Sequence, residues 1–233
     1  KDMKEGYSDE YKCTCLAVSL VIVLFSPRLV SVLSLWMPQS GSPLESVACY
    51  SAFLALSYVV GISVESTIPY SIKDWLLYPE ICRWSLQRPG CTIFTEIQNG
   101  EPGDFRFDVS EARKRYGAQI QNAQGKDSRE ASRYQNAEWY KLYRKHSSNA
   151  SVRSNNLGHL YSRDAFALGF STFLLSVVCN VAGMVLCGEA LVSLTSLAIV
   201  GVFAAASWLS ARWKAKRLVT TVIACDIAND GKE

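Results

Sequence analysis

Long apolar runs and polar blocks alternate along this chain of 233 residues. Four runs stand out, at residues 15–37, 46–64, 165–188 and 190–210, and the last three contain no charged residue. Each run has roughly the 20 residues that an α-helix needs to cross a bilayer. None shows the polar face at 3.6-residue spacing that a soluble helix requires. The pattern predicts an all-α membrane protein with four transmembrane helices in two hairpins.

The distribution of charge indicates which side of the membrane each polar segment occupies. The turn after the first run carries Glu45, the tight turn after the third run is Gly188–Glu189, and neither contains Lys or Arg. By contrast, residues 65–164 hold 15 Lys and Arg against 12 Asp and Glu, and residues 212–217 read RWKAKR. Positive charge beside a span stays cytoplasmic. We therefore expect a multi-pass protein of the inner (cytoplasmic) membrane with both termini and the central block in the cytoplasm.

These boundaries divide the chain into four parts. They are a first transmembrane hairpin, a cytoplasmic helical domain inserted between the hairpins, a second transmembrane hairpin and a cytoplasmic C-terminal helix, at residues 13–64, 65–164, 165–210 and 211–233. The C-terminal part has an apolar stripe that consists of Leu218, Val219, Val222, Ile223 and Ile227. We expect this amphipathic helix to pack against the inserted domain.

Proline and β-type alternation define the start of the inserted domain. Residues 66–88 predict a helix that is kinked at Pro69 and Pro79, since proline removes a helical hydrogen bond. Residues 91–97, CTIFTEI, alternate enough to predict a short strand.

Capping residues define the helices that follow. Asp108 and Glu111 have capping-box spacing and open a helix that ends at about residue 124. Ser128 is placed to cap a helix over residues 129–147, and Asn149 to cap one that continues into the third apolar run. One face of the helix over 129–147 collects Trp139, Leu142, Tyr143 and His146.

Composition adds little chemistry to this picture. The net charge is +3, which is too small to indicate nucleic acid binding by itself. The eight cysteines form no Cys-x-x-Cys pair and only two histidines are present, so we expect neither a metal site nor a cofactor.

Two residues of the inserted domain are candidates for catalysis. Arg153 and His159 have five residues between them, the spacing with which HEPN-type ribonucleases bind a phosphate and move a proton. The alternative is that both are surface or interface residues of a helix beside the membrane. His146 fits a packed histidine better than a catalyst, because Trp139 and Tyr143 share its face.

Arg163 and Asp164 mark the entry to the third run. One interpretation places Arg163 at lipid headgroups and pairs Asp164 with Arg212 or Lys216. The other makes this ring of charges the mouth of a pore in an oligomer.

Two further polar residues lie within apolar runs. A charge at Arg28 is costly in a span, so it either reaches the headgroups or faces a water-filled pathway near Asn180. Gly169 and Gly201 are small enough for membrane helices to approach closely, as in a tight bundle or a homo-oligomer within the lipid bilayer.

The segment at residues 135–164 begins QNAEWYKLYRKH, ends HLYSRD and leads directly into an apolar hairpin. It resembles bacterial membrane proteins of antiviral defence, especially the accessory pore-forming proteins of RNA-targeting type VI CRISPR systems. The resemblance implies an oligomeric inner-membrane effector that permeabilises or depolarises the membrane. Only Arg153 and His159 match that family's motif residue by residue.

Two other functions remain open from the sequence. One is a membrane-tethered ribonuclease that uses Arg153 and His159. The other is a structural or sensory membrane protein without pore activity, whose cytoplasmic domain recruits a protein or RNA partner.

Overall fold

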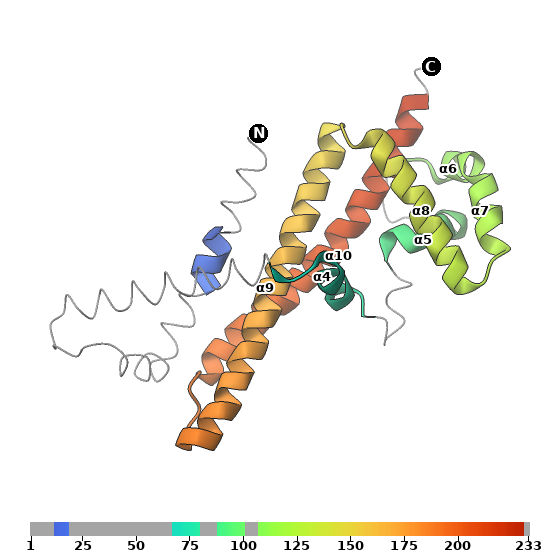
Figure 1. Ribbon diagram of the computed structural model, residues 1–233. Helices are drawn as coiled ribbons and strands as arrows, with labels where there is room; N and C mark the ends of the chain where they lie inside the picture. Colours follow the sequence, from blue (N-terminus) through green and yellow to red (C-terminus); the bar gives the residue numbers. More distant parts are fainter. Residues whose placement is uncertain (1–11, 19–66, 80–87, 101–106, 231–233) are drawn as a thin grey trace. The chain divides into compact units, whose positions relative to one another are not determined.

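A computed structural model describes residues 12–18, 67–79, 88–100 and 107–230, and these ranges are all-α (Figure 1). A short helix occupies residues 12–18. The labelled helices are α4 (Tyr70–Leu77), α5 (Pro89–Asn99), α6 (Val109–Arg115), α7 (Gly117–Gln124), α8 (Ser128–His146), α9 (Ala150–Cys187) and α10 (Leu194–Asp230). The all-α prediction is confirmed for these ranges. Most of the first two predicted spans, including Arg28, lies outside the described residues.

Side-chain caps fix the starts of three helices. The Asp108 carboxylate accepts from Ser110 N at 2.7 Å and begins α6, as predicted. Asp127, one residue before the predicted cap, accepts from two backbone N–H groups and begins α8. Asn149 begins α9 by accepting from the Ser151 N–H at 2.9 Å, which confirms the sequence prediction. The single helix predicted over 108–124 is instead divided at Tyr116 into α6 and α7.

The strand predicted at residues 91–97 is wrong, because this segment forms most of α5. Its buried residues Gly90, Phe94 and Ile97 recur every three to four positions, which is helical spacing. Pro89 marks the start of the helix and Gly100, with φ of 75°, marks its end. Proline at the first position and glycine after the last are typical of helix boundaries.

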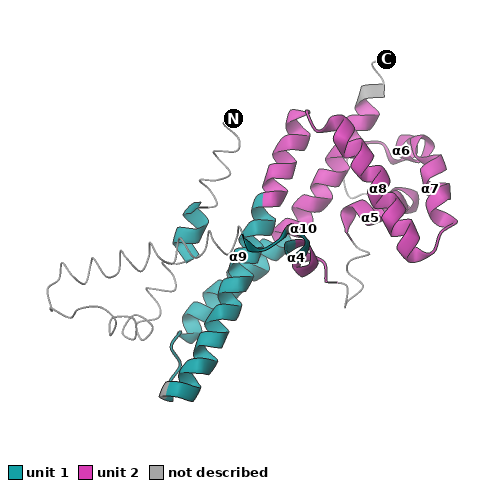
Figure 2. Ribbon diagram, viewed as in Figure 1, with its two compact units in different colours: residues 1–73, 161–209 teal, residues 74–160, 210–233 magenta. Residues whose placement is uncertain are grey.

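The described chain forms two compact units, and each takes part of both long helices (Figure 2). Unit 1 comprises residues 1–73 and 161–209, and unit 2 comprises residues 74–160 and 210–233. In unit 1, a Cβ atom added to Gly169 would lie 2.8 Å from the Phe203 ring and 3.2 Å from Ala204 Cα. The absence of a side chain there therefore allows α9 and α10 to pack closely, as the small residues predicted.

The short helix over residues 12–18 packs on α9 within unit 1. Cys15 and Val18 form a buried cluster with Leu168. The Thr14 hydroxyl lies 2.6 Å from the Tyr161 hydroxyl. This contact places the start of the first apolar run beside the start of the third.

The turn that joins α9 to α10 is longer than the two residues predicted. The α9 helix ends at Cys187 and α10 begins at Leu194, so six residues connect them. Gly188 has φ of 73°, which an L-residue adopts only with strain. The Asn180 side chain donates to the Val192 carbonyl at 3.0 Å and accepts from the Val192 N–H at 2.7 Å, and so closes the turn.

The core of unit 2 joins α5, α6, α7 and the end of α10. Its main cluster consists of Ile93, Phe94, Ile97, Phe107, Ala112, Tyr116, Ile120, Val219, Ile223 and Ile227. A second cluster contains Val152, Leu218 and Val222, with Trp139, Leu142 and Tyr143 packed against it. The prediction that the C-terminal stripe packs against the inserted domain is confirmed.

Candidate functional site

The apolar surface of unit 1 is the first candidate for function. Among the residues described, two helices, Ala150–Leu186 and Leu194–Ala228, are long and apolar enough to cross a membrane. Only 33% and 22% of their most apolar stretches are buried, whereas a core helix of a soluble protein is mostly buried. The exposed apolar side chains include Leu175, Val178, Val181, Met184, Val185, Ile199 and Val202. An apolar surface of this extent is typical of a membrane or protein interface.

The polar side chains within this surface are satisfied locally. Ser171 and Ser176 donate to carbonyl groups one turn earlier in α9, those of Ala167 and Thr172, at 2.7 and 2.8 Å. Both hydrogen bonds of the Asn180 amide go to Val192. A helix in lipid has no water to satisfy such groups, so internal pairing suits a bilayer environment.

Arg163 and Asp164 come together with a third charge that the sequence did not reveal. Arg163 Nε and Nη2 lie 3.0 and 2.9 Å from Asp164 Oδ1, and Lys73 Nζ of α4 lies 3.3 Å from the same oxygen. All three residues are buried. The structure thus pairs Asp164 with Arg163 and Lys73, while Lys216 lies 3.5 Å from Glu96. No local pattern around Lys73 indicated this tertiary pairing.

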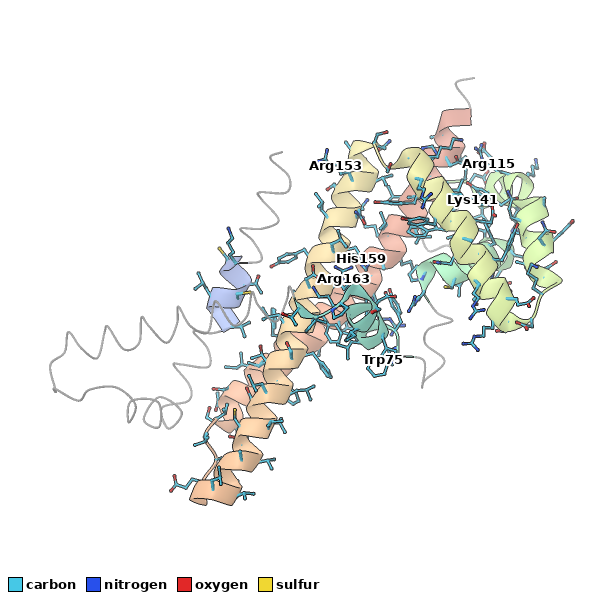
Figure 3. The ribbon with its side chains drawn as sticks, viewed as in Figure 1. Trp75, Arg115, Lys141, Arg153, His159 and Arg163 are labelled. Carbon is cyan, nitrogen blue, oxygen red and sulfur yellow. The ribbon has the colours of Figure 1, made fainter. Side chains whose placement is uncertain are left out.

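Arg153 and His159 do not converge. Six residues along α9 correspond to a rise of about 9 Å and a turn that leaves the two side chains about 120° apart. Arg153 is exposed near the start of α9, and His159 lies further along the helix (Figure 3). His159 Nδ1 donates to the Ala211 carbonyl at 3.1 Å, since a carbonyl only accepts. Within one chain, this pair does not form a composite phosphate and proton-transfer site.

The densest cluster of titratable groups in the described chain surrounds Asp226, whose side chain is buried. Oδ1 lies 2.7 Å from His146 Nε2 and 3.0 Å from Lys145 Nζ. Oδ2 lies 2.9 Å from the Tyr116 hydroxyl and 2.7 Å from Arg115 Nη2. This carboxylate therefore connects α6, α8 and α10 within unit 2.

Burial alone would raise the pKa of Asp226, but the surrounding donors outweigh it and lower that pKa to about 2. Burial, followed by the Asp226 charge, raises the pKa of Tyr116. Asp226 lies 16 residues, about 24 Å of helix, beyond Ser210, where the apolar run ends. Both oxygens of this carboxylate are occupied, by hydrogen bonds from three side chains and an ion pair with Arg115. The cluster therefore links helices rather than serving as a general base.

The sequence predicted a packed His146 but missed Asp226, its partner. The missed signal is one acidic residue in the apolar stripe of the C-terminal helix, between Cys225 and Ile227. A buried acid among apolar residues requires partners. Among the described residues, no group of three or more His, Cys, Asp or Glu side chains is placed to hold a metal ion.

In comparisons with known proteins, no family model, no curated protein and no solved structure matches this chain. Function is therefore inferred from one feature of each unit. The first is the exposed apolar surface of the α9–α10 hairpin, and the second is the polar helical unit closed by Asp226.

Proposed function

We propose that this chain is an oligomeric effector of antiviral defence that spans the inner membrane four times and permeabilises or depolarises it. The observation that carries the proposal is the apolar, mostly unburied surface of α9 and α10 in unit 1. Lipid tails could cover that surface without leaving the Ser171 and Asn180 side chains unsatisfied, because both already have hydrogen-bond partners within the protein.

The contact of the N-terminal helix with α9 supports four spans. Cys15 opens the first apolar run, and Leu168, which it contacts, lies three residues after the start of the third. Two apolar runs that begin at one level enter a bilayer from the same side. Both termini are then cytoplasmic, in agreement with the basic residues at 212–217.

Close packing between α9 and α10 supports an oligomer. Phe203 and Ala204 occupy the space that a side chain at Gly169 would need, so no water-filled pathway passes between the two helices at that level. A pathway for ions would therefore form between copies of the chain, along their exposed apolar and small residues. The resemblance of residues 135–164 to pore-forming defence proteins agrees with this arrangement.

The outer face of α8 supports recruitment of a cytoplasmic partner. Arg129, Arg133, Tyr140 and Arg144 are exposed and fall within about 60° of one another around the helix. The Arg144 guanidinium lies 4.7 Å from the centre of the Tyr140 ring. A basic face with an aromatic residue suits an acidic protein surface or RNA.

The test is membrane depolarisation in cells that express the full chain, together with dye release from liposomes that contain the purified protein. We expect wild type to depolarise and leak, and Gly169→Leu to lose most of the leak because it separates α9 from α10. Gly201→Ala is the matched control, since its Cβ would lie 3.5 Å from Phe173, an ordinary contact.

Three results would contradict the proposal. The first is membrane-inserted wild-type protein that leaves the membrane potential unchanged and the liposomes sealed. The second is extraction of the wild-type protein from membranes by alkaline carbonate. The third is RNA cleavage that His159→Ala abolishes, which would favour the ribonuclease instead.

A further inference from the structure

The most exposed tryptophan in the described chain lies just beyond the apolar part of α10. The uncharged run ends at Ser210, and Trp213 follows one turn later and is 78% exposed. Tryptophan has a large apolar body and one N–H donor, so this degree of exposure to water is unfavourable. Tryptophan is enriched where one end of a side chain meets lipid and the other meets water.

The basic residues around Trp213 divide into two groups. Arg212 lies 5.9 Å from the centre of the Tyr78 ring, and the stem of Lys214 packs toward Gly158, so both face other parts of unit 2. Lys216 and Arg217 are exposed and follow Trp213 at i+3 and i+4, which places all three on one face of α10.

The order of these residues along α10 matches the layers of a bilayer surface. Trp213 lies about 5 Å beyond Ser210 along the helix axis, and Arg217 lies about 10 Å beyond it. The polar headgroup region on each side of the apolar core is roughly 5–7 Å thick. Trp213 would therefore lie within the headgroup region. Lys216 and Arg217 would lie a few Å beyond it, and their long side chains lean back toward it because helical side chains tilt toward the helix N-terminus.

We infer that Trp213, Lys216 and Arg217 form a binding surface for the headgroup of an anionic phospholipid. The inference rests on the proposed membrane placement of α10. Two cations on one helical face attract a phosphate-bearing lipid, and an adjacent exposed indole packs on its glycerol and upper acyl chain. Glu96 lies 3.5 Å from Lys216, so an anionic headgroup would compete with this partly exposed carboxylate for the amine.

The experiment uses the full chain in nanodiscs of phosphatidylcholine with a minor share of phosphatidylglycerol. Lipids that remain bound after detergent extraction are measured for wild type and for Lys216→Gln/Arg217→Gln. We expect wild type to retain phosphatidylglycerol preferentially over phosphatidylcholine. The ratio of retained phosphatidylglycerol to phosphatidylcholine should fall roughly fivefold for each charge that the variant removes. Lys114→Gln/Lys126→Gln removes two exposed charges from other parts of unit 2 and should retain the wild-type preference.

A second measurement remains informative if the double variant folds poorly. The fluorescence of Trp213 is taken as the difference between wild type and Trp213→Phe. We expect bromine atoms near the headgroup end of the acyl chains to quench it more strongly than bromine atoms at the chain ends. Equal quenching by both, or none, would place Trp213 away from the interface and overturn the proposal.

Other outcomes separate the alternatives. Equal phosphatidylglycerol retention by wild type and the Lys216/Arg217 variant would overturn the lipid site, as would an equal loss in the Lys114/Lys126 control. Full competition by free glycerol phosphate would show a site for soluble phosphate instead. Wild-type protein that alkaline carbonate extracts would contradict the proposed membrane spans, whereas resistant protein without lipid preference contradicts only this inference.

Discussion

His146 and Asp226, which are 80 residues apart in the sequence, approach to 2.7 Å between Nε2 and Oδ1 inside unit 2. Neither side chain is more than 5% exposed. The contact fixes the end of α10 to the end of α8, in a region where the surrounding residues are mainly apolar. The stability of unit 2 should therefore depend strongly on one carboxylate.

Replacement of Asp226 by Ala should destabilise unit 2 by about 3 kcal/mol, because it leaves the groups around a buried charge without their acceptor. Removal of one partner from a buried ion pair usually costs about 3–5 kcal/mol. The lower end of that range applies here, because Lys145 and Arg115 are partly exposed and can turn toward water. The measurement is urea unfolding of the full chain in detergent, followed by near-ultraviolet circular dichroism. Asp127→Asn, which removes an exposed charge and retains a capping side chain, should cost under about 0.5 kcal/mol.

The pH dependence of unfolding should identify the same carboxylate. The pKa of Asp226 is about 2 in the folded chain, below its ordinary value of 3.8, so its charged form stabilises the fold above that ordinary value. That stability is lost as the pH falls from about 5 toward 2. The slope of unfolding free energy against pH should be smaller in Asp226→Asn than in wild type. Parallel curves over this window would show that Asp226 is not stabilised by its partners.

The buried charges in unit 1 should respond unequally to substitution. Asp164→Ala leaves Arg163 and Lys73 buried without their shared carboxylate, so we expect a loss of about 3–5 kcal/mol. Lys73→Met leaves the Arg163–Asp164 pair intact and should cost much less. Thermal unfolding of the detergent-solubilised variants tests the order. A larger effect for Lys73→Met would show that the amine, and not the Arg163 pair, balances Asp164.

The hairpin turn should depend on Asn180. Asn180→Leu removes two hydrogen bonds to Val192 and should destabilise the hairpin by about 1–2 kcal/mol, the range for polar contacts between membrane helices. Ser171→Ala is the control, because the Ser171 hydroxyl bonds only to carbonyl groups of its own helix. Proteolysis within residues 188–193 measures the opening of the turn. Equal cleavage of both variants would contradict the role of Asn180.

Reporter fusions test the proposed topology. Fusions at residue 120 and at residue 233 should both report a cytoplasmic location, because basic residues flank these segments and are absent from the predicted outer turns. A periplasmic signal from either fusion would contradict the four-span arrangement.

Periodicity and caps predicted those parts of the fold that depend on neighbouring residues. The apolar runs over 165–187 and 194–210, the cap at Asn149 and the stripe around Val222 could each be read from local spacing. The segment at 91–97 could not, because seven apolar and polar residues fit a strand and a helix about equally well, and only burial against α8 distinguishes them.

The candidate site was less predictable, because its contacts join distant parts of the chain. Lys73 meets Asp164, and His146 meets Asp226, across long separations that no local pattern encodes. The spacing of Arg153 and His159 matched a motif, yet a continuous helix turns the two side chains apart. A spacing indicates chemistry only after the secondary structure between the residues is known.

The composition of the unit 2 core also constrains how the protein is made. Ile93 and Phe94 emerge early in synthesis, but Val219, Ile223 and Ile227, which complete their cluster, emerge only after both apolar helices. A domain cannot close before its last strand or helix exists, and chains grow at about 5–20 residues per second. For several seconds, the apolar residues of α5, α6 and α7 therefore lack the partners that α10 supplies, so unit 2 can complete its core only after both apolar helices have been made.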